Sequence, residues 1–533
     1  MLGGMQDFEL RVPSLIDHAA REHPTRAIVS RWADGRETRT DWAGIAHDAR
    51  RLAQALERLG IAPGERVATL AMNHAHHLAA WYGVIGMGGV IHTINPRLFD
   101  DQLVYIANHA ADRVLLYDRA FQPIVDRLRS RWTTIDHYVV MDGDGADGFE
   151  ALLAAENGDY AWRTGPERDP CMLCYTSGTT GNPKGVLFTH RSSILHAQLV
   201  ASPAVLGLTA GSVLLPVVPL FHAAAWGTPF AAPIAGATLV MSAVNDAGVL
   251  CDLMNRERVT ISSGVPTVWL AMFAHIDATG QRPEHLRLAT IGGSAAPRAM
   301  IARLMDMGVE VKHLWGMTET SPVATVAAPP PGFADWPREA QLDLLVRQGQ
   351  VPYGIELTIR DADDRPLPRD GVSAGRLHIR GPWVIQRYFG AEQDAVDADG
   401  WFDTGDVAIL HPDGTMQITD RSKDVIKSGG EWISSVELEN AALGCPGVAE
   451  AAAIGVAHPK WDERPLLLVV RKPEAAVDAA AIRAHLADVV ARWWLPDAIL
   501  FVDDLPHTAT GKLLKTALRD RYRDFRFDGA TPA

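Results

Sequence analysis

The sequence contains few cysteines. Its 533 residues include only four, too few for a disulfide framework, and this favours a reducing compartment. Cys171 and Cys174 have the C-x-x-C spacing, but Cys251 and Cys445 offer no second pair. Because the first two lie in an apolar run that leads into a glycine-rich loop, we interpret them as buried thiols and not as zinc ligands.

A long uninterrupted apolar segment is also lacking. The longest stretch without Asp, Glu, Lys or Arg is Ser192–Asn245, and its most apolar part, 213–244, contains several prolines and His222. A membrane-spanning helix needs about 20 apolar residues without such breaks. We therefore expect buried strands and loops in this stretch, and no transmembrane segment.

The chain has no excess of positive charge. Its 50 Lys and Arg against 64 Asp and Glu give a formal net charge of −14, which excludes a nonspecific nucleic-acid binder that needs a basic face. Residues 1–10 lack the basic stretch and apolar run of a secretory leader, so we expect a cytoplasmic protein. With 47% hydrophobic residues, the chain can form a large core.

Short apolar runs alternate with helical patterns through the first four hundred residues, which is typical of an α/β protein with mostly parallel sheets. Strands are predicted over 172–176 and 185–189 around a glycine-rich loop, and a helix is predicted to begin at Pro266. A strand over 288–291 leads into a Gly-Gly-Ser turn. Ligands of such sheets bind beyond the carboxyl ends of the strands, where these turns lie.

The pattern changes after Asp403. A charged bridge over 420–424 precedes a predicted helix over 435–443, two strands, a helix over 480–494, and a final strand and helix. About 110 residues suffice for a small α+β domain. We predict a large, multi-subdomain N-terminal domain over 1–420 with mostly parallel sheets, and a small mobile α+β domain over 421–533 on a hinge.

The most specific feature is the segment Tyr175–Gly185, with the sequence YTSGTTGNPKG. Its glycines let backbone N–H groups approach phosphate oxygens, its hydroxyls donate hydrogen bonds, and its lysine adds a positive charge. The Walker A spacing does not fit, because Lys184 follows a proline and precedes a glycine. The predicted phosphate-binding residues are Thr176, Ser177, Gly178, Thr179, Thr180, Gly181 and Lys184.

This segment resembles the signature loop of the adenylate-forming superfamily, which includes acyl-CoA synthetases, nonribosomal-peptide adenylation domains and firefly luciferase. Four further segments agree in the family's order, so the resemblance covers the chain from about Tyr175 to Lys512. The region before it is consistent with the family but has no motif of comparable specificity.

The segment His313–Glu319, HLWGMTE, is the second of these. The resemblance implies that Trp315 stacks on adenine beside Gly316, that Thr318 contacts the α-phosphate, and that Glu319 holds Mg²⁺, with Thr176 as a further candidate ligand. Most family members have tyrosine where this chain has Trp315, and either ring can stack. Gly292, Gly293 and Ser294 resemble the turn on the adenine side. Taken alone, Glu319 has the pattern of a solvated acid at a helix start.

Three segments nearer the C-terminus complete the resemblance. In WFDTGD, Asp406 matches an aspartate that binds both ribose hydroxyls, which suits a bidentate acceptor. In the next segment Arg421 assists at the ribose and Lys423 is the hinge residue, although an exposed charged linker also fits this run. The resemblance places Lys427, Ser428, Gly429 and Gly430 on the CoA side of that hinge. Lys512 matches the catalytic lysine.

The acyl group is less well defined by the sequence. Val218–Trp226 resembles the segment that bounds the acyl pocket, where a tryptophan matching Trp226 gates an apolar tunnel and His222 lies near the substrate carboxylate. Both side chains also fit plain core packing. No acid occurs within 213–244 to pair with a substrate ammonium, which disfavours an amino-acid substrate. Small residues, among them Ala225 and Gly293, leave room for a bulky or long apolar acid.

The resemblance implies an ATP-dependent acyl-CoA ligase for a medium- or long-chain fatty acid, with ATP, CoA and Mg²⁺. The alternatives are a ligase for a short or substituted acid, such as 3-methylmercaptopropionate or an aryl-alkanoate, and an adenylation enzyme that loads a carrier protein. A non-catalytic binding protein is disfavoured, because it would be expected to have lost Lys512 or Glu319. Long-chain synthetases of this type often dimerise, so a homodimer stays open.

Overall fold

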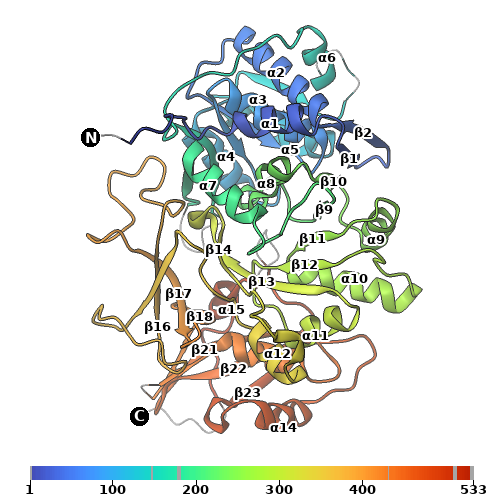
Figure 1. Cartoon of the computed structure of the whole chain (residues 1–533). Coiled ribbons are helices and arrows are strands. Elements are labelled where there is room, and N and C mark those ends of the chain that lie inside the picture. Colours follow the sequence, from blue (N-terminus) through green and yellow to red (C-terminus); the bar gives the residue numbers. More distant parts are fainter. Residues whose placement is uncertain are drawn as a thin grey trace.

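The computed structural model describes residues 3–143, 145, 148–176, 182–429, 431–507 and 513–527. Two sheets, both mostly parallel, form the core of the part of the chain before β15 (Figure 1). In spatial order, the six-stranded sheet contains β6 (His137–Val140), β5 (Asp112–Tyr117), β3 (Arg66–Leu70), β4 (Val90–Thr93), β7 (Pro170–Tyr175) and β8 (Gly185–Thr189). The eight-stranded sheet contains β14 (Val323–Val326), β13 (Glu310–Gly316), β12 (Leu288–Ile291), β11 (Ile261–Gly264), β9 (Val213–Pro216), β10 (Thr238–Ser242), β1 (Ala27–Arg31) and β2 (Glu37–Asp41).

Antiparallel pairs occur only at the edges of these two sheets, within the described residues: β7 with β8, β13 with β14 and β1 with β2. A third, antiparallel sheet contains β15 (Glu356–Arg360), β16 (Ala374–Arg380), β17 (Phe402–Leu410) and β18 (Met416–Arg421). The predicted fold class is confirmed by the two parallel-rich sheets.

Helices connect and cover the sheets of the larger part. They are α1 (Pro13–Glu22), α2 (Trp42–Arg58), α3 (Ala75–Gly86), α4 (Asp100–Ala110), α5 (Gln122–Leu128), α6 (Phe149–Ala154), α7 (His190–Ala201), α8 (Thr228–Ala235), α9 (Ala247–Arg256), α10 (Pro266–Thr279), α11 (Arg298–Asp306) and α12 (Arg338–Leu345). Almost every residue of α3 is buried, which explains why its sequence is apolar all round. No helix among the described residues is long and apolar enough to cross a membrane.

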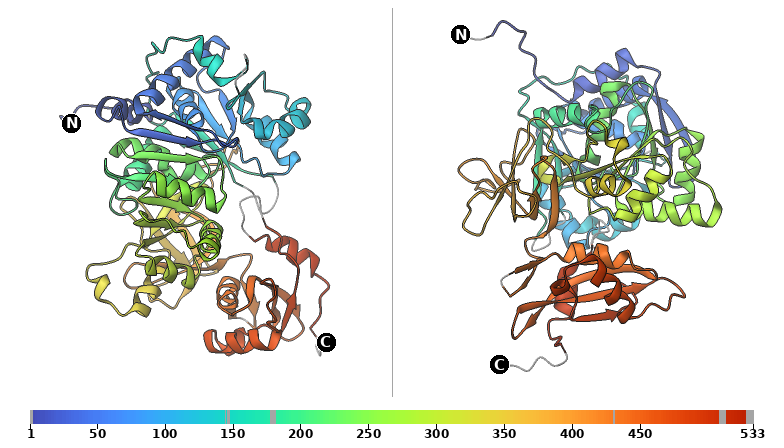
Figure 2. Two further views of the ribbon diagram at one scale, coloured as in Figure 1. Left: turned by 90° about the vertical axis from the view of Figure 1, so that its right-hand side faces the viewer. Right: turned by 60° about the horizontal axis from the view of Figure 1, so that its bottom comes forward.

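The C-terminal unit has its own sheet and its own core. Its sheet contains β20 (Glu431–Ile433), β19 (Ile426–Ser428), β22 (Asp462–Arg471), β21 (Val448–His458) and β23 (Ala498–Phe501), and its helices are α13 (Ser435–Leu443), α14 (Ala479–Val489) and α15 (Lys515–Arg521). Its two apolar clusters contain only residues after Val425. Figure 2 shows this unit at one end of the molecule, beyond the three other sheets.

Local signals explain where several elements begin and end. Helix α10 begins at Pro266, whose fixed φ suits a first helical position, and ends before Gly280, where φ is +75°. Two expectations were wrong in part. The apolar stretch 213–244 also contains α8, which has Pro229 in its first turn and stops at Gly236. The helix predicted over 480–494 ends at Val489, because Val490 adopts an extended backbone and packs against the C-terminal core.

Candidate active site

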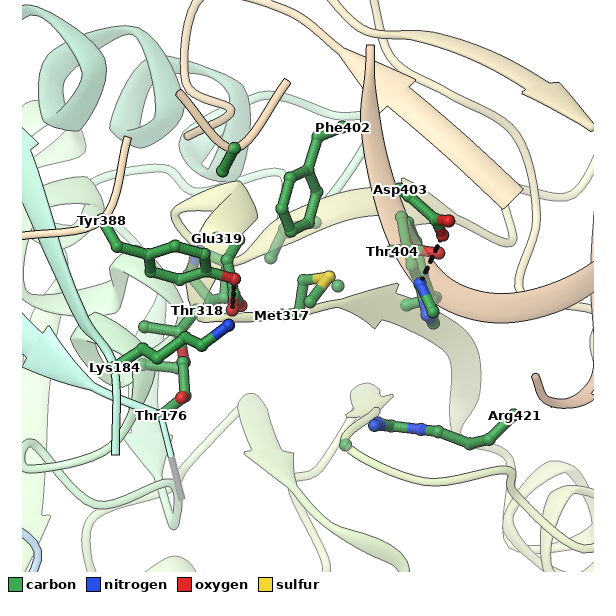
Figure 3. A pocket seen from close by; sticks show the side chains of 18 of the residues that line it. Thr176, Lys184, Met317, Thr318, Glu319, Tyr388, Phe402, Asp403, Thr404 and Arg421 are labelled. Atoms are coloured by element: carbon green, nitrogen blue, oxygen red, sulfur yellow. Dashed lines mark hydrogen bonds between the residues drawn. The ribbon is translucent and has the colours of Figure 1, made fainter. Parts of the chain in front are cut away.

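A cavity of about 630 Å³ lies at the carboxyl ends of β7, β12 and β13, as expected for parallel strands (Figure 3). The end of β18 and the segment after it, the turn after β9, the connection from β16 to β17 and the start of β17 form further parts of its wall. The predicted site residues that line it are Thr176, Lys184, His222, Trp226, Gly292, Gly293, Trp315, Gly316, Thr318, Glu319, Arg421 and Lys423.

Other predicted residues lie outside this lining. Asp406 and Ala225 are buried and do not line the cavity, and Ser294 is exposed outside it. Lys427 and Ser428 are on β19 of the C-terminal unit, followed by Gly429, and none of these three contributes to the cavity. Predicted residues Ser177, Gly178, Thr179, Thr180, Gly181, Gly430 and Lys512 lie outside the described residues.

The phosphate side of the cavity is built on the β7–β8 hairpin. Tyr175 pairs with Gly185 at the ends of the two strands, and the N–H of Thr176 donates to the carbonyl of Lys184 at 2.9 Å. This pairing closes the base of the predicted phosphate-binding loop. The Lys184 ammonium lies 4.9 Å from the ring centroid of Tyr388, over the aromatic face. The loop base therefore presents a cation to the cavity.

Glu319 is buried, with 6% of its surface exposed, so the reading as a solvated acid is wrong. Its carboxylate accepts a hydrogen bond of 2.8 Å from the hydroxyl of Tyr388, and its backbone carbonyl accepts one from the N–H of Ile385. Burial raises the pKa of Glu319, although the hydroxyl of Tyr388 and the charges of Arg421 and Lys184 oppose the shift. Burial disfavours the charged carboxylate, so a cation bound beside Glu319 would stabilise it.

The donor set around Glu319 fits Mg²⁺ in one particular way. Among the described residues, no group of three or more His, Cys, Asp or Glu side chains is placed to hold a metal ion. Mg²⁺ commonly takes one or two carboxylates and completes its octahedral shell with water and substrate phosphates. Glu319, which lines the same cavity as Lys184, fits that arrangement.

The nucleotide side is a hydrogen-bonded cluster around the buried carboxylate of Asp406. The indole N–H of Trp315 donates to its Oδ2 at 2.9 Å, and the guanidinium of Arg421 lies 3.0 Å from its Oδ1. Asp406 on β17 is paired with Arg421 on β18, so the sheet fixes the two side chains together. Residues from three separate motifs therefore meet at this point. Trp315 stands where most family members have tyrosine, and its indole N–H is hydrogen-bonded to Asp406.

On the acyl side, an amide side chain organises the loop that follows β9. Asn73, at the start of α3, donates through Nδ2 to the carbonyls of Pro216 at 3.2 Å and Val218 at 3.0 Å, and its Oδ1 accepts from the N–H of Leu220 at 2.7 Å. The same loop continues into His222, which lines the cavity. Asn73 is 3% exposed, so no solvent competes for these bonds. It thereby fixes the loop that forms this part of the cavity wall.

The turn Ala223–Gly227 carries Trp226 and has an unusual backbone. Ala223, Ala225 and Trp226 have φ angles of +41°, +47° and +54°, all in the left-handed region. The Trp226 ring packs against Gly292, where an added Cβ would stand 3.2 Å from its Cη2 atom. Glycine at this position therefore makes room for the ring. Trp226 is 7% exposed and touches both the core and the cavity.

Sequence reasoning missed two residues of this site. Tyr388 occurs in a segment, QRYFG, that matches no chemical pattern when read alone. Asn73 begins the polar string Asn73-His-Ala-His-His, which runs from the end of the β3–α3 connection into the first turn of the buried helix α3, and that polar start was a usable signal. Each is identified by its contacts with distant segments, which residue type alone does not reveal.

Comparisons with known proteins identify relatives over nearly the whole chain. The model for the AMP-binding enzyme family matches residues 16–389, and the model for the AMP-binding enzyme C-terminal domain matches residues 437–512. The chain is 48% identical to 3-methylmercaptopropionyl-CoA ligase of Ruegeria pomeroyi, over 98% of this chain and 99% of that one. It is 44% identical to medium-chain-fatty-acid–CoA ligase of Ectopseudomonas oleovorans, over 98% of each. Anthranilate CoA ligase AuaEII, solved with anthranoyl-AMP, superposes with a TM-score of 0.86 at 26% identity, over 98% of this chain and 99% of that one.

Proposed function

Because the chain belongs to the AMP-binding enzyme family, we propose that it is an AMP-forming acid–CoA ligase that activates an apolar carboxylic acid. The observation that carries this proposal is the cavity that gathers Lys184, Glu319 and the cluster around Asp406. Lys184 lies 135 residues before Glu319, and Glu319 lies 87 residues before Asp406. In one site, Lys184 would offer a positive charge to the phosphates, Glu319 a ligand to the metal ion, and Asp406 a hydrogen-bond acceptor to the ribose hydroxyls.

In the first half-reaction, an oxygen of the substrate carboxylate attacks the α-phosphorus of ATP. The bond from that phosphorus to the bridging oxygen breaks, and pyrophosphate leaves with the electron pair. Two anions must approach each other, so Lys184 and Lys512 serve to offset the negative charge that builds up. Mg²⁺, held by Glu319 with Thr176 as a second candidate, would supply further charge neutralisation on the phosphates. Trp315, Gly316 and Asp406 hold the nucleoside, and Thr318 contacts the α-phosphate.

In the second half-reaction, the CoA thiol loses its proton and its sulfur attacks the acyl carbon. The bond from that carbon to the phosphate oxygen breaks, and AMP leaves. Lys512 would occupy the path of the thiol, so the small domain, 421–533, rotates about Lys423 relative to the large domain, 1–420. Lys423 lines the cavity from the segment that joins β18 to β19, which suits a hinge at the mouth of the site. Lys427, Ser428, Gly429 and Gly430 would then face CoA.

The acid is proposed to be a medium- or long-chain fatty acid, bound beside Trp226, Gly292 and Gly293, with the buried Ala225 behind them. His222 lies on the cavity wall, where a substrate carboxylate would arrive. A second candidate is 3-methylmercaptopropionate, a short thioether acid, and it is favoured by the 48% identity to the Ruegeria pomeroyi ligase over nearly the whole chain. An aryl-alkanoate and a carrier protein as acceptor are further alternatives. Family resemblance also suggests a homodimer, which light scattering would test.

The test measures AMP and pyrophosphate release with ATP, Mg²⁺ and a panel of acids, with and without CoA. The panel runs from propionate to palmitate and includes 3-methylmercaptopropionate and phenyl-alkanoates. Turnover that requires CoA and peaks at one acid supports the ligase and identifies its substrate. Pyrophosphate release with an adenylate that CoA cannot discharge would favour a carrier-loading enzyme. No pyrophosphate release with any acid would refute the proposed function.

A further inference from the structure

The segment Trp383–Phe389, between β16 and β17, connects the turn that carries Glu319 with the start of β8, next to Lys184. On one side, the Ser321 hydroxyl donates to the carbonyl of Trp383 at 2.8 Å, and the N–H of Ile385 donates to the carbonyl of Glu319 at 2.8 Å. On the other side, the N–H of Phe389 donates to the carbonyl of Gly185 at 2.8 Å. The segment is therefore hydrogen-bonded both to the turn that carries Glu319 and to the strand that follows Lys184.

Tyr388 stands near the end of this segment and contacts both charged residues (Figure 3). Its hydroxyl donates to Oε1 of Glu319 at 2.8 Å, and its ring face receives the Lys184 ammonium at 4.9 Å. The ring itself is held edge-on by Phe402, with 6.5 Å between the centroids. One side chain, fixed by its own packing, thus touches the proposed metal ligand and the phosphate-loop cation.

We propose that Tyr388 is a positioning residue that orients Glu319 for the divalent cation and Lys184 for the triphosphate. This inference rests on the proposed function of the same cavity. A hydroxyl that donates to one carboxylate oxygen fixes the rotation of that carboxylate, and a charge-assisted bond of this kind is among the stronger ones in proteins. An aromatic face holds an ammonium group without cancelling its charge, whereas a carboxylate partner would neutralise it. The lysine thereby keeps its full charge for the phosphates.

Two substitutions separate the two contacts of Tyr388. Tyr388→Phe removes the hydroxyl and keeps the ring, so only the bond to Glu319 is lost. Tyr388→Leu removes the hydroxyl and the ring, so Lys184 also loses its partner. Tyr353→Phe is the matched control, because Tyr353 is fully exposed and lies outside the cavity lining.

The measurement is binding to the purified full-length protein, without acid or CoA. Mn²⁺ affinity is measured by electron paramagnetic resonance in the presence of a non-hydrolysable ATP analogue, and analogue affinity is measured by calorimetry with EDTA. We expect Tyr388→Phe to weaken Mn²⁺ binding about tenfold, the loss expected for one charge-assisted hydrogen bond, and to leave metal-free nucleotide binding unchanged. Tyr388→Leu should weaken both Mn²⁺ binding and metal-free nucleotide binding, and Tyr353→Phe should change neither affinity.

Wild-type Mn²⁺ affinity in Tyr388→Phe would overturn the inference. So would an equal loss of metal-free nucleotide binding in Tyr388→Phe and Tyr388→Leu, because that result indicates a merely structural role. Failure of the proposed function is distinguishable, since it appears as wild-type protein that binds Mn²⁺ and nucleotide but turns over no acid. In that case the positions of Glu319 and Lys184 still depend on Tyr388 as described.

Discussion

The amide of Asn73 offers a sharp test of how the acyl wall is positioned. It makes three hydrogen bonds to one loop, at 3.2, 3.0 and 2.7 Å, and all three are shielded from solvent. Asn73→Ala leaves the carbonyls of Pro216 and Val218 and the N–H of Leu220 without these partners. Each buried hydrogen bond contributes about 1 kcal/mol net, and an unpaired buried group costs about 1–3 kcal/mol, so the loss is at least about 3 kcal/mol.

The lost hydrogen-bond energy destabilises the ordered conformation of the loop that leads to His222. A change of about 3 kcal/mol corresponds to roughly 100-fold in the equilibrium that orders the loop, at about 1.4 kcal/mol per factor of ten. We expect the KM for the acid to rise at least tenfold, whereas the KM for ATP stays within about twofold, because Asn73 touches neither Trp315 nor Asp406. Urea unfolding of the variant should show a lower midpoint.

Asn108 provides the matched control. Its amide also bridges a loop, donating to the carbonyl of Arg131 at 3.0 Å and accepting from the N–H of Thr133 at 2.9 Å, but at the protein surface. Water replaces those partners in Asn108→Ala, so that variant should lose less than about 1 kcal/mol and keep its acid KM. Equal acid KM values in wild type, Asn73→Ala and Asn108→Ala would refute the reasoning. A parallel rise in the ATP KM would indicate general damage to the fold instead.

Three further predictions concern single side chains. Lys512→Ala should abolish adenylate formation but leave thioester formation from preformed acyl-adenylate largely intact; equal loss in both half-reactions would contradict its proposed role. Trp226→Ala should change the order of preference among acids at constant ATP KM. An unchanged order would indicate that Trp226 only packs in the core and does not contact the acid. Burial lowers the pKa of His196 to about 3, while its ordinary value is 6.5. The unfolded chain therefore binds the extra proton, and stability falls as the pH drops from 6.5 towards 3. His196→Gln should reduce the difference in unfolding free energy between pH 7 and pH 5 by about 2 kcal/mol in urea unfolding, and an unchanged difference would show that His196 is protonated in the native state.

The sequence predicted the elements whose boundaries depend on local chemistry. The ranges of β8, β12 and α13 agree with the predicted ones to the residue, since glycine, proline and apolar patterning act within a few positions. Helix α14 was predicted too long because its end depends on the packing of Val490 against the C-terminal core, which is a tertiary effect. The resemblance supplied the site residues, but it left the partners of those residues open.

The connections within the site needed the structure. Asp406 was predicted from its motif, yet its bonds to Trp315 and Arg421 depend on strand register between β17 and β18 and on the end of β13. Glu319, taken alone, has the pattern of a solvated residue, because its sequence gives no sign that the Trp383–Phe389 segment would cover it. Burial and pairing across more than sixty residues are tertiary properties that local patterns do not encode.

The turn at Trp226 shows why the choice of acid is the hardest property to derive from the residues. Three alanines in a row favour a right-handed helix, yet two of them and Trp226 have left-handed φ angles, at a cost of roughly 1 kcal/mol each. The next residue, Gly227, lies so close to His196 that an added Cβ would meet its ring at 2.7 Å, and the Thr228 hydroxyl donates to the carbonyl of Ala225 at 2.8 Å. These contacts hold the turn in a conformation that its own sequence disfavours. This part of the cavity wall, which is proposed to border the acyl group, is therefore set by backbone strain that the surroundings stabilise, so its shape depends on those surroundings as well as on its own side chains.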